Sequence, residues 1–193
     1  MGKSITKEEI SGFDVEQFSG KIYVIDNPVD AEKAVHYLSR FEILGFDTET
    51  RPSFKRGDLH SVSLIQISTL DTCFLFRSNG NGFPSALIQL LSNPKILKIG
   101  LSLKDDFLSM SRLLKFSPQG FVDLQKLVQK YNIDDLSLQK IYAILFHKKI
   151  SKSQRLTNWE AEELSEAQKK YAALDAWACL KIYESLCFTK KSI

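Results

Sequence analysis

The sequence has 193 residues, of which 44% are hydrophobic and 25% are charged; it is long enough to bury the core of one globular domain and too short for two comfortable ones. These proportions exclude a disordered chain, and no apolar stretch reaches the length of about 20 residues that a membrane helix needs. The formal net charge of +3 permits a polyanionic partner but does not require one.

The first half of the chain is predicted to consist mainly of strands. Residues 1–20 are polar and are expected to form an N-terminal arm, which packs on a single domain over residues 21–193. Apolar residues at helical spacing follow Asn27 and Pro28, and proline suits the first turn of a helix. In chain order, the predicted elements are a strand over 21–25, a helix over 28–41, a strand that carries Asp47 and Glu49, strands over 62–68 and 72–76 that form a hairpin, a helix over 84–91 and a strand over 95–101.

The second half is predicted to be helical. The spacing of its apolar residues indicates helices over residues 106–114, 123–131, 137–146 and 166–187, and Asp123 is expected to cap the second of them. Residues 51–59 and 79–82 are expected to be loops. Strands that are followed by covering helices predict an α/β fold, in which helices flank a mixed sheet in one domain.

Two pairs of polar residues, far apart in the sequence, carry the chemistry. Asp47 and Glu49 are two residues apart on a predicted strand, so their side chains leave the same face. Tyr171 and Asp175 are four residues apart on the last predicted helix and also share a face. Carboxylates that lie close together repel one another, so a cluster of them is tolerated only when protons or cations neutralise it.

Divalent cations are the natural partners of such a cluster. Hard oxygen ligands favour Mg²⁺ or Mn²⁺, which usually retain water molecules and bind phosphate oxygens. Two such ions about 3.5–4 Å apart can stabilise both the attacking and the leaving oxygen when a phosphodiester is hydrolysed. The phenol of a tyrosine has an ordinary pKa of about 10, so Tyr171 is better suited to orienting a water molecule than to removing its proton.

Three segments resemble, in the same order, the motifs of one nuclease family. Phe46-Asp47-Thr48-Glu49-Thr50 resembles the first motif of the DEDD family of 3′-5′ exonucleases, and residues 171–176 resemble the third motif, which contains a tyrosine. The second motif of the family supplies one aspartate, and residues 98–110 fit that motif.

The second motif offers two candidate aspartates, Asp105 and Asp106. Charge does not choose between them. The family usually places a large apolar residue four positions after the ligand, and Met110 therefore favours Asp106. Asp105 is assigned to the start of the same helix, where its carboxylate can cap free N–H groups or favour the helix dipole.

The likeness is to the tyrosine (DEDDy) subgroup, which includes ribonuclease D and the Werner-type exonucleases, and it covers the chain from Lys21 onward. It implies a ribonuclease H-like fold, with a mixed five-stranded sheet flanked by helices, and an enzyme that releases nucleoside 5′-monophosphates from the 3′ end of DNA, RNA or both. Tyr171 would position the attacking water, and the main chain near Thr50 would lie against the terminal nucleotide. Two divalent metal ions, Mg²⁺ or Mn²⁺, would be held by four acids: Asp47, Glu49, Asp106 and Asp175.

Basic residues in two loops give weaker support for a nucleic-acid partner. Arg51, Lys55 and Arg56 follow the first motif. A second basic group precedes Trp159, and it consists of Lys148, Lys149, Lys152 and Arg155. Such side chains bind the phosphate backbone without reading its sequence, and Arg155 is the predicted substrate-binding residue among them. The alternative is that both loops are ordinary solvated surface and that Trp159 belongs to the core.

Several alternatives stay open at the level of the sequence. A nucleic-acid-binding or adaptor protein on the same fold could lack catalytic activity, although such a protein would be expected to have lost some of the acids. A partner-binding domain without metal and an endonuclease that cuts internally are the other candidates. No membrane contact is expected, and three cysteines without metal-ligand spacing favour reduced thiols in a cytoplasmic protein. A preference for DNA or RNA has no short signature.

Overall fold

The computed structural model describes residues 2–53, 60–78, 82–111 and 117–188. Three expectations from the sequence lie outside these residues. They are residues 54–59 of the first predicted loop with the basic side chains of Lys55 and Arg56, residues 79–81 of the second predicted loop, and the end of the helix predicted over 106–114.

One six-stranded mixed sheet forms the centre of the fold. Its strands lie in the order β1 (Lys21–Ile25), β4 (Thr72–Arg77), β3 (Val62–Ser68), β2 (Ile43–Thr50), β5 (Leu97–Gly100) and β6 (Phe121–Asp123). The pairs β2–β3 and β3–β4 are antiparallel, and the other three pairs are parallel. The predicted α/β class with a mixed sheet is confirmed, but the sheet has six strands where five were expected. The additional strand, β6, has three residues and is too short to show the alternation by which strands are predicted.

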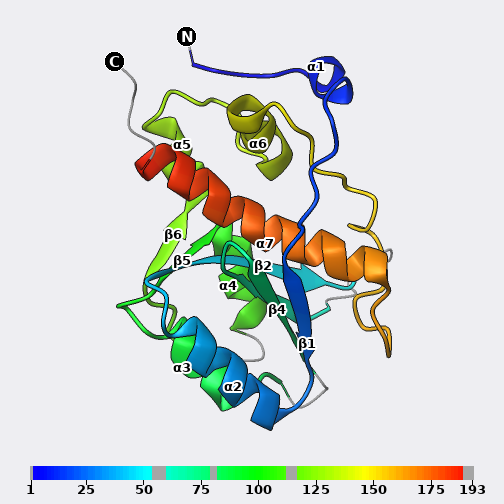
Figure 1. Cartoon of the computed structure of the whole chain (residues 1–193), viewed down its shortest axis with the longest axis vertical. Helices are drawn as coiled ribbons and strands as arrows, with labels where there is room; N and C mark the ends of the chain where they lie inside the picture. Colours follow the sequence, from blue (N-terminus) through cyan, green and yellow to red (C-terminus); the bar gives the residue numbers. More distant parts are fainter. Residues whose placement is uncertain (1, 54–59, 79–81, 112–116, 189–193) are drawn as a thin grey trace.

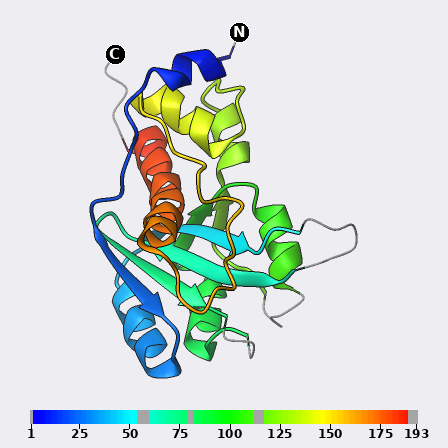
Figure 2. The ribbon, with the colours of Figure 1, turned by 90° about the vertical axis from the view of Figure 1, so that its right-hand side faces the viewer.

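Helices cover both faces of the sheet and divide the core into two clusters. On one face lie α2 (Pro28–Leu38), α3 (Ser85–Leu91) and α4 (Leu103–Met110). On the opposite face α7 (Glu166–Cys187) crosses the sheet, and α5 (Leu124–Gln129) and α6 (Leu138–Phe146) pack beside it (Figure 1, Figure 2). The last helix has the bounds that the sequence predicts. None of the helices in the described segments is long and apolar enough to cross a membrane.

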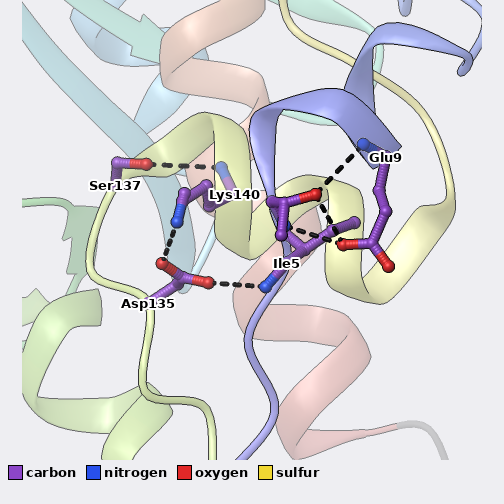
Figure 3. Close-up of polar contacts among 6 residues, drawn as sticks. Ile5, Glu9, Asp135, Ser137 and Lys140 are labelled. Atoms are coloured by element: carbon purple, nitrogen blue, oxygen red, sulfur yellow. Dashed lines mark hydrogen bonds and ion pairs between the residues drawn. The ribbon is translucent and has the colours of Figure 1, made fainter.

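The N-terminal arm begins with contacts to the segment that joins α5 to α6. It contains a short helix, α1 (Lys7–Ser11), whose first turn is closed by a capping box between Thr6 and Glu9. Ahead of α1, the main-chain N–H of Ile5 donates to Asp135 at 2.9 Å, and Lys140 of α6 donates to the other oxygen of that carboxylate (Figure 3). The sequence does not predict α1, because its five residues are too few to show helical periodicity.

The arm then runs beside the residues that follow α6. Glu16 accepts hydrogen bonds from the Tyr142 hydroxyl at 2.8 Å and from Lys148 Nζ at 3.0 Å. The main-chain N–H of Glu16 also donates to the carbonyl oxygen of Lys149 at 2.9 Å. These bonds join the arm to the start of the loop that carries Arg155.

Helix α7 approaches β2 closely at Gly45. A Cβ atom at this position would lie 2.0 Å from the main-chain oxygen of Ala176, which is far inside contact distance. The buried face of α7 is rich in small side chains, which also permit a close approach; they are Ala172, Ala173, Ala176 and Ala178. Glycine at position 45 therefore allows the helix to lie against the strand that carries Asp47 and Glu49.

Replacement of Gly45 by alanine is expected to push α7 away from β2, because the main-chain oxygen of Ala176 cannot move aside as a flexible side chain would. We expect the free energy of unfolding to fall by about 1–3 kcal/mol, as measured by urea denaturation. Gly12→Ala is the matched control, since the nearest atom to its Cβ would be 3.8 Å away. Equal stabilities of the two variants would contradict the close approach of helix and strand.

Candidate active site

Three acidic side chains from two elements meet on the face of the sheet that α7 covers. Asp47 and Glu49 come from β2, and Asp175 comes from α7. Each residue offers one carboxylate oxygen, and these oxygens all lie within 4.8 Å of one another. The structure therefore brings together the strand pair and the helix acid that the sequence singles out.

Burial and mutual repulsion keep this cluster from carrying its full charge. Burial, followed by the charges of Asp175 and Glu49, raises the pKa of Asp47 well above its ordinary value. Burial, followed by Asp175 and Asp106, raises the pKa of Glu49 to about 9, and the charge of Arg155 opposes this rise. Without a cation the cluster therefore holds protons at neutral pH, as expected for carboxylates that share a buried site.

Asp175 carries the clearest mark of a cation site. Its exposed fraction is 7%, and its oxygen Oδ1 has no hydrogen-bond partner in the described part of the chain. Burial raises the pKa of Asp175 to about 7, while the Tyr171 hydroxyl and the charge of Lys152 lower it. A buried carboxylate oxygen without a donor is costly unless a cation neutralises it. A cluster of three carboxylates, one of which has an unpartnered oxygen, fits a hard divalent cation.

Asp106 lies next to this group on α4. The hydroxyl of Thr48, which stands between the two strand acids, donates to Asp106 Oδ1. Burial raises the pKa of Asp106 to about 6, although the Thr48 hydroxyl lowers it. Asp106 in turn raises the pKa of Asp47 and of Glu49, yet it is not among the three residues whose oxygens lie within 4.8 Å. Its role as a fourth metal ligand stays a prediction.

The two neighbouring aspartates of α4 differ in their surroundings, because Asp105 is exposed and Asp106 is half-buried. The helix starts earlier than predicted, at Leu103, and the residue before it, Ser102, has a left-handed φ of 61°. The carboxylate of Asp123 accepts the main-chain N–H groups of Ser102 and Leu103 at 3.1 and 3.2 Å. Of the two roles predicted for Asp105, the structure supports the one at the helix dipole, because Asp105 lies in the first turn of α4. The N–H groups at the start of the helix are bound by Asp123.

Asp123 serves a second helix as well. Its side chain accepts the main-chain N–H of Gln125 at 2.9 Å and so caps α5, as the sequence predicts. The same carboxylate raises the pKa of Asp106. Sequence patterns identify the local cap and miss the cap of α4, because that contact joins residues about 20 positions apart in the chain.

Tyr171 lies one turn ahead of Asp175 on α7, as predicted. Burial, followed by the charges of Asp175 and Glu49, raises the pKa of Tyr171 above its ordinary value. The phenol therefore keeps its proton throughout the neutral range and can donate a hydrogen bond, but it cannot act as a base. Its ring centre lies 6.0 Å from that of Trp159, which is 1% exposed and belongs to the core.

Two exposed cations of the loop before Trp159 act on the acids. Arg155 lowers the pKa of Glu49, and Lys152 lowers the pKa of Asp175. The sequence singles out Arg155 and leaves Lys152 among the other basic residues, although the two are only three positions apart. Positive charge beside a cluster of acids would attract the phosphates of a polyanion.

Thr50 and Arg51 directly follow Glu49 in the chain. Thr50 is half-buried and pairs with Val62 of β3, after an irregularity in the ladder between Glu49 and Thr50. The side chain of Arg51 donates to Glu160 at 3.1 Å, so its charge is already matched by an acid. The substrate contacts predicted for Thr50 and Arg155 stay predictions.

Known proteins share the sequence of this chain over most of its length. A family model described as 3′-5′ exonuclease matches residues 22–188. The chain is 34% identical over 155 residues to the bifunctional 3′-5′ exonuclease/ATP-dependent helicase WRN of Mus musculus. The alignment covers 77% of this chain and 11% of that protein. The chain is 29% identical over 193 residues to a 3′-5′ exonuclease of Arabidopsis thaliana, and this alignment covers 90% of this chain and 66% of that protein. The chain therefore spans only part of the length of these relatives.

A solved structure shares the fold. The ribonuclease D of Trypanosoma brucei in complex with RNA U12 superposes with a TM-score of 0.79 at 20% identity, over 90% of this chain and 65% of that one. At this identity the likeness concerns the fold, and it confirms the predicted ribonuclease H-like class. The chain is also 32% identical over 103 residues to ribonuclease D of Haemophilus influenzae, an alignment that covers 53% of this chain and 26% of that protein. The family match and these relatives confirm the predicted resemblance to exonucleases of the ribonuclease D and Werner types.

Proposed function

This chain belongs to the family of 3′-5′ exonucleases, and from that premise we propose that it hydrolyses phosphodiester bonds at the 3′ end of DNA or RNA and releases nucleoside 5′-monophosphates. The observation that carries the proposal is the meeting of Asp47, Glu49 and Asp175 within 4.8 Å, beside a tyrosine that keeps its proton. The sequence also retains Asp106, so none of the four acids is missing. A catalytically inactive relative would be expected to have lost at least one of them.

The cofactors in this proposal are two divalent ions, Mg²⁺ or Mn²⁺. Asp47, Glu49, Asp106 and Asp175 would hold them, because all four offer hard oxygen ligands from one small region. When bound, such ions lower the pKa of an attacking water and stabilise charge on the attacking and leaving oxygens. The raised pKa values of Glu49 and Asp175 support this assignment, since cation binding would displace the protons that these acids hold.

The other residues would act on the water and on the substrate. The Tyr171 hydroxyl, which keeps its proton, can hold the attacking water by a hydrogen bond. The main chain at Thr50 follows Glu49 directly and is the place where the terminal nucleotide would rest. Arg155 adds positive charge near Glu49 and would attract the phosphate of the strand.

The substrate class follows from the chemistry and from the relatives. The ribonuclease D structure of Trypanosoma brucei contains RNA, and the family model describes an exonuclease without naming the sugar. We therefore assign this chain to nucleic-acid 3′ ends in general, with DNA and RNA to be compared directly.

A comparison of linear and circular strands tests the proposed function. With Mg²⁺ or Mn²⁺, a linear strand labelled at its 5′ end is expected to give a ladder of products that shorten by one nucleotide at a time. A circle of the same sequence should stay intact, because it has no 3′ end. Parallel DNA and RNA strands identify the preferred sugar. Nicking of the circle would indicate an endonuclease and would contradict the proposal.

Replacement of Arg155 by alanine is expected to raise KM for an oligonucleotide about 10-fold with a smaller change in kcat, because a charge-assisted contact to phosphate contributes about 1.5–3 kcal/mol. The slope of log KM against log salt concentration should decrease by about one. Lys169→Ala is the matched control, since Lys169 pairs with Glu166 at the exposed start of α7. Equal KM values for the two variants would contradict a contact between Arg155 and the substrate.

A further inference from the structure

Gln66 is a buried polar residue whose side chain has no partner. Its exposed fraction is 0%. In the described segments, four buried side-chain atoms lack a hydrogen bond, and two of them are Oε1 and Nε2 of Gln66. Burial of an amide without partners costs free energy, because its bonds to water are lost and not replaced. A group of this kind calls for a physical explanation.

The register of the sheet places Gln66 beside the acid cluster. In the antiparallel pair of β2 and β3, Gln66 lies directly opposite Asp47, and side chains of opposite residues leave the same face of a sheet. On its other side Gln66 pairs with Leu75 of β4, which belongs to the core cluster under α7. The amide therefore lies between an apolar neighbour and the first acid of the site. A third unpartnered atom, Asp175 Oδ1, belongs to that same cluster of acids.

We propose that Gln66 is a positioning residue, whose amide Nε2 donates a hydrogen bond to the carboxylate of Asp47 when the site holds its metal ions. The proposal rests on the exonuclease function proposed above. Opposite residues of an antiparallel pair have Cβ atoms about 4.5–5.5 Å apart, a gap that a glutamine side chain can bridge. Carboxylates that bind metals are commonly oriented by a hydrogen bond from a second residue.

The missing partner has a consequence for the energetics of metal binding. Gln66 has already lost its contact with water in the folded chain, so a new bond to Asp47 requires no further desolvation. The free energy of that bond therefore contributes to the free energy of metal binding. An apolar side chain of similar size would fill the same space and remove this contribution. Loss of the amide should therefore strengthen the metal-free fold and weaken the metal site.

The test compares Gln66→Met with the wild-type chain in two measurements. In the presence of a chelator, the melting temperature of the variant should rise by about 2–4 °C, because an unpartnered amide is removed. Titration with Mn²⁺ alone, followed by the melting temperature at each concentration, should show an affinity that is about 10- to 100-fold weaker. Leu75→Met is the matched control, since Leu75 is buried on the same face of the next strand. Its Mn²⁺ affinity should equal that of the wild type.

Three results would overturn the role of Gln66. They are a lower metal-free melting temperature in Gln66→Met, a Mn²⁺ affinity equal to that of the wild type, and failure of both Gln66→Met and Gln66→Leu to fold. The failure of the proposed function has a different signature, because the wild type would then show neither a melting shift with Mn²⁺ nor shortening of 3′ ends. A wild type that passes both assays, beside a Gln66→Met variant that behaves identically, would overturn the role of Gln66 alone.

Discussion

Replacement of Asp175 by asparagine is expected to abolish the release of mononucleotides and, at the same time, to stabilise the metal-free protein. The change removes a negative charge from a site where burial already raises the pKa of Asp175 to about 7. Asparagine keeps the shape of the side chain and can still accept a bond from Tyr171, but its neutral amide attracts a divalent cation less strongly. We expect kcat to fall at least about 100-fold, the size seen when one preorganised electrostatic group is lost. Stabilisation by Mn²⁺ should disappear.

Both effects can be measured at pH 8, where Asp175 of the wild type is largely ionised. Melting curves with chelator and with Mn²⁺ report stability, and end-labelled strands report activity. Asp105→Asn is the matched control, because Asp105 is an exposed acid in the first turn of α4; it should keep both the activity and the stabilisation. If the Asp175→Asn variant gave the same ladder of shortened products as the wild type, Asp175 would not be part of the catalytic site. A lower melting temperature in chelator would show that its charge has a structural partner.

The metal-free protein is expected to lose stability as the pH rises from 5 to 8. Folding raises the pKa of Asp106 to about 6, of Asp175 to about 7 and of Glu49 to about 9, whereas such groups titrate near pH 4 in an unfolded chain. An acid with a raised pKa stabilises the folded state fully below about pH 4, and this contribution is lost as the pH rises through the folded pKa. Since one pKa unit corresponds to about 1.4 kcal/mol, the melting temperature should fall by on the order of 10 °C.

Melting curves in chelator at four pH values between 5 and 8 test this expectation. The pH range ends at 8 because of Lys98, whose pKa burial lowers to about 8. Above that pH, the deprotonation of Lys98 would raise the stability and mask the effect of the acids. Saturating Mn²⁺ should flatten the profile, because the cation replaces the protons of the cluster. The Asp175→Asn variant should show a shallower slope than the wild type. A level profile in chelator would contradict a cluster of buried, repelling acids.

The two halves of the acid cluster could be predicted from the sequence because each half depends on one local periodicity. A period of two places Asp47 and Glu49 on one face of a strand, and the helical period places Tyr171 and Asp175 on one face of a helix. Both elements have strong patterns, and the helix has the predicted bounds. The family resemblance then indicates that the strand, the helix and the segment with Asp106 form one site.

Contacts between distant segments leave no comparable signal. The cap that Asp123 gives to α4 and the close approach of Gly45 to Ala176 both join residues far apart in the chain. Gln66 has the pattern of an ordinary polar residue in a strand, and only the register of three strands reveals its place between Asp47 and Leu75. The short elements α1 and β6 were not predicted for another reason, since neither is long enough for a period to repeat.

The double cap at Asp123 bears on how this protein can change over evolutionary time. One carboxylate binds the N–H groups of Ser102 and Leu103 at the start of α4 and of Gln125 at the start of α5. The start of α4 is fixed by these bonds, and Thr48 donates to Asp106 on the same helix. Because one carboxylate serves both helices, a change at position 123 should disturb the starts of α4 and α5 together, so this position is less free to diverge than the exposed Asp105 beside the site.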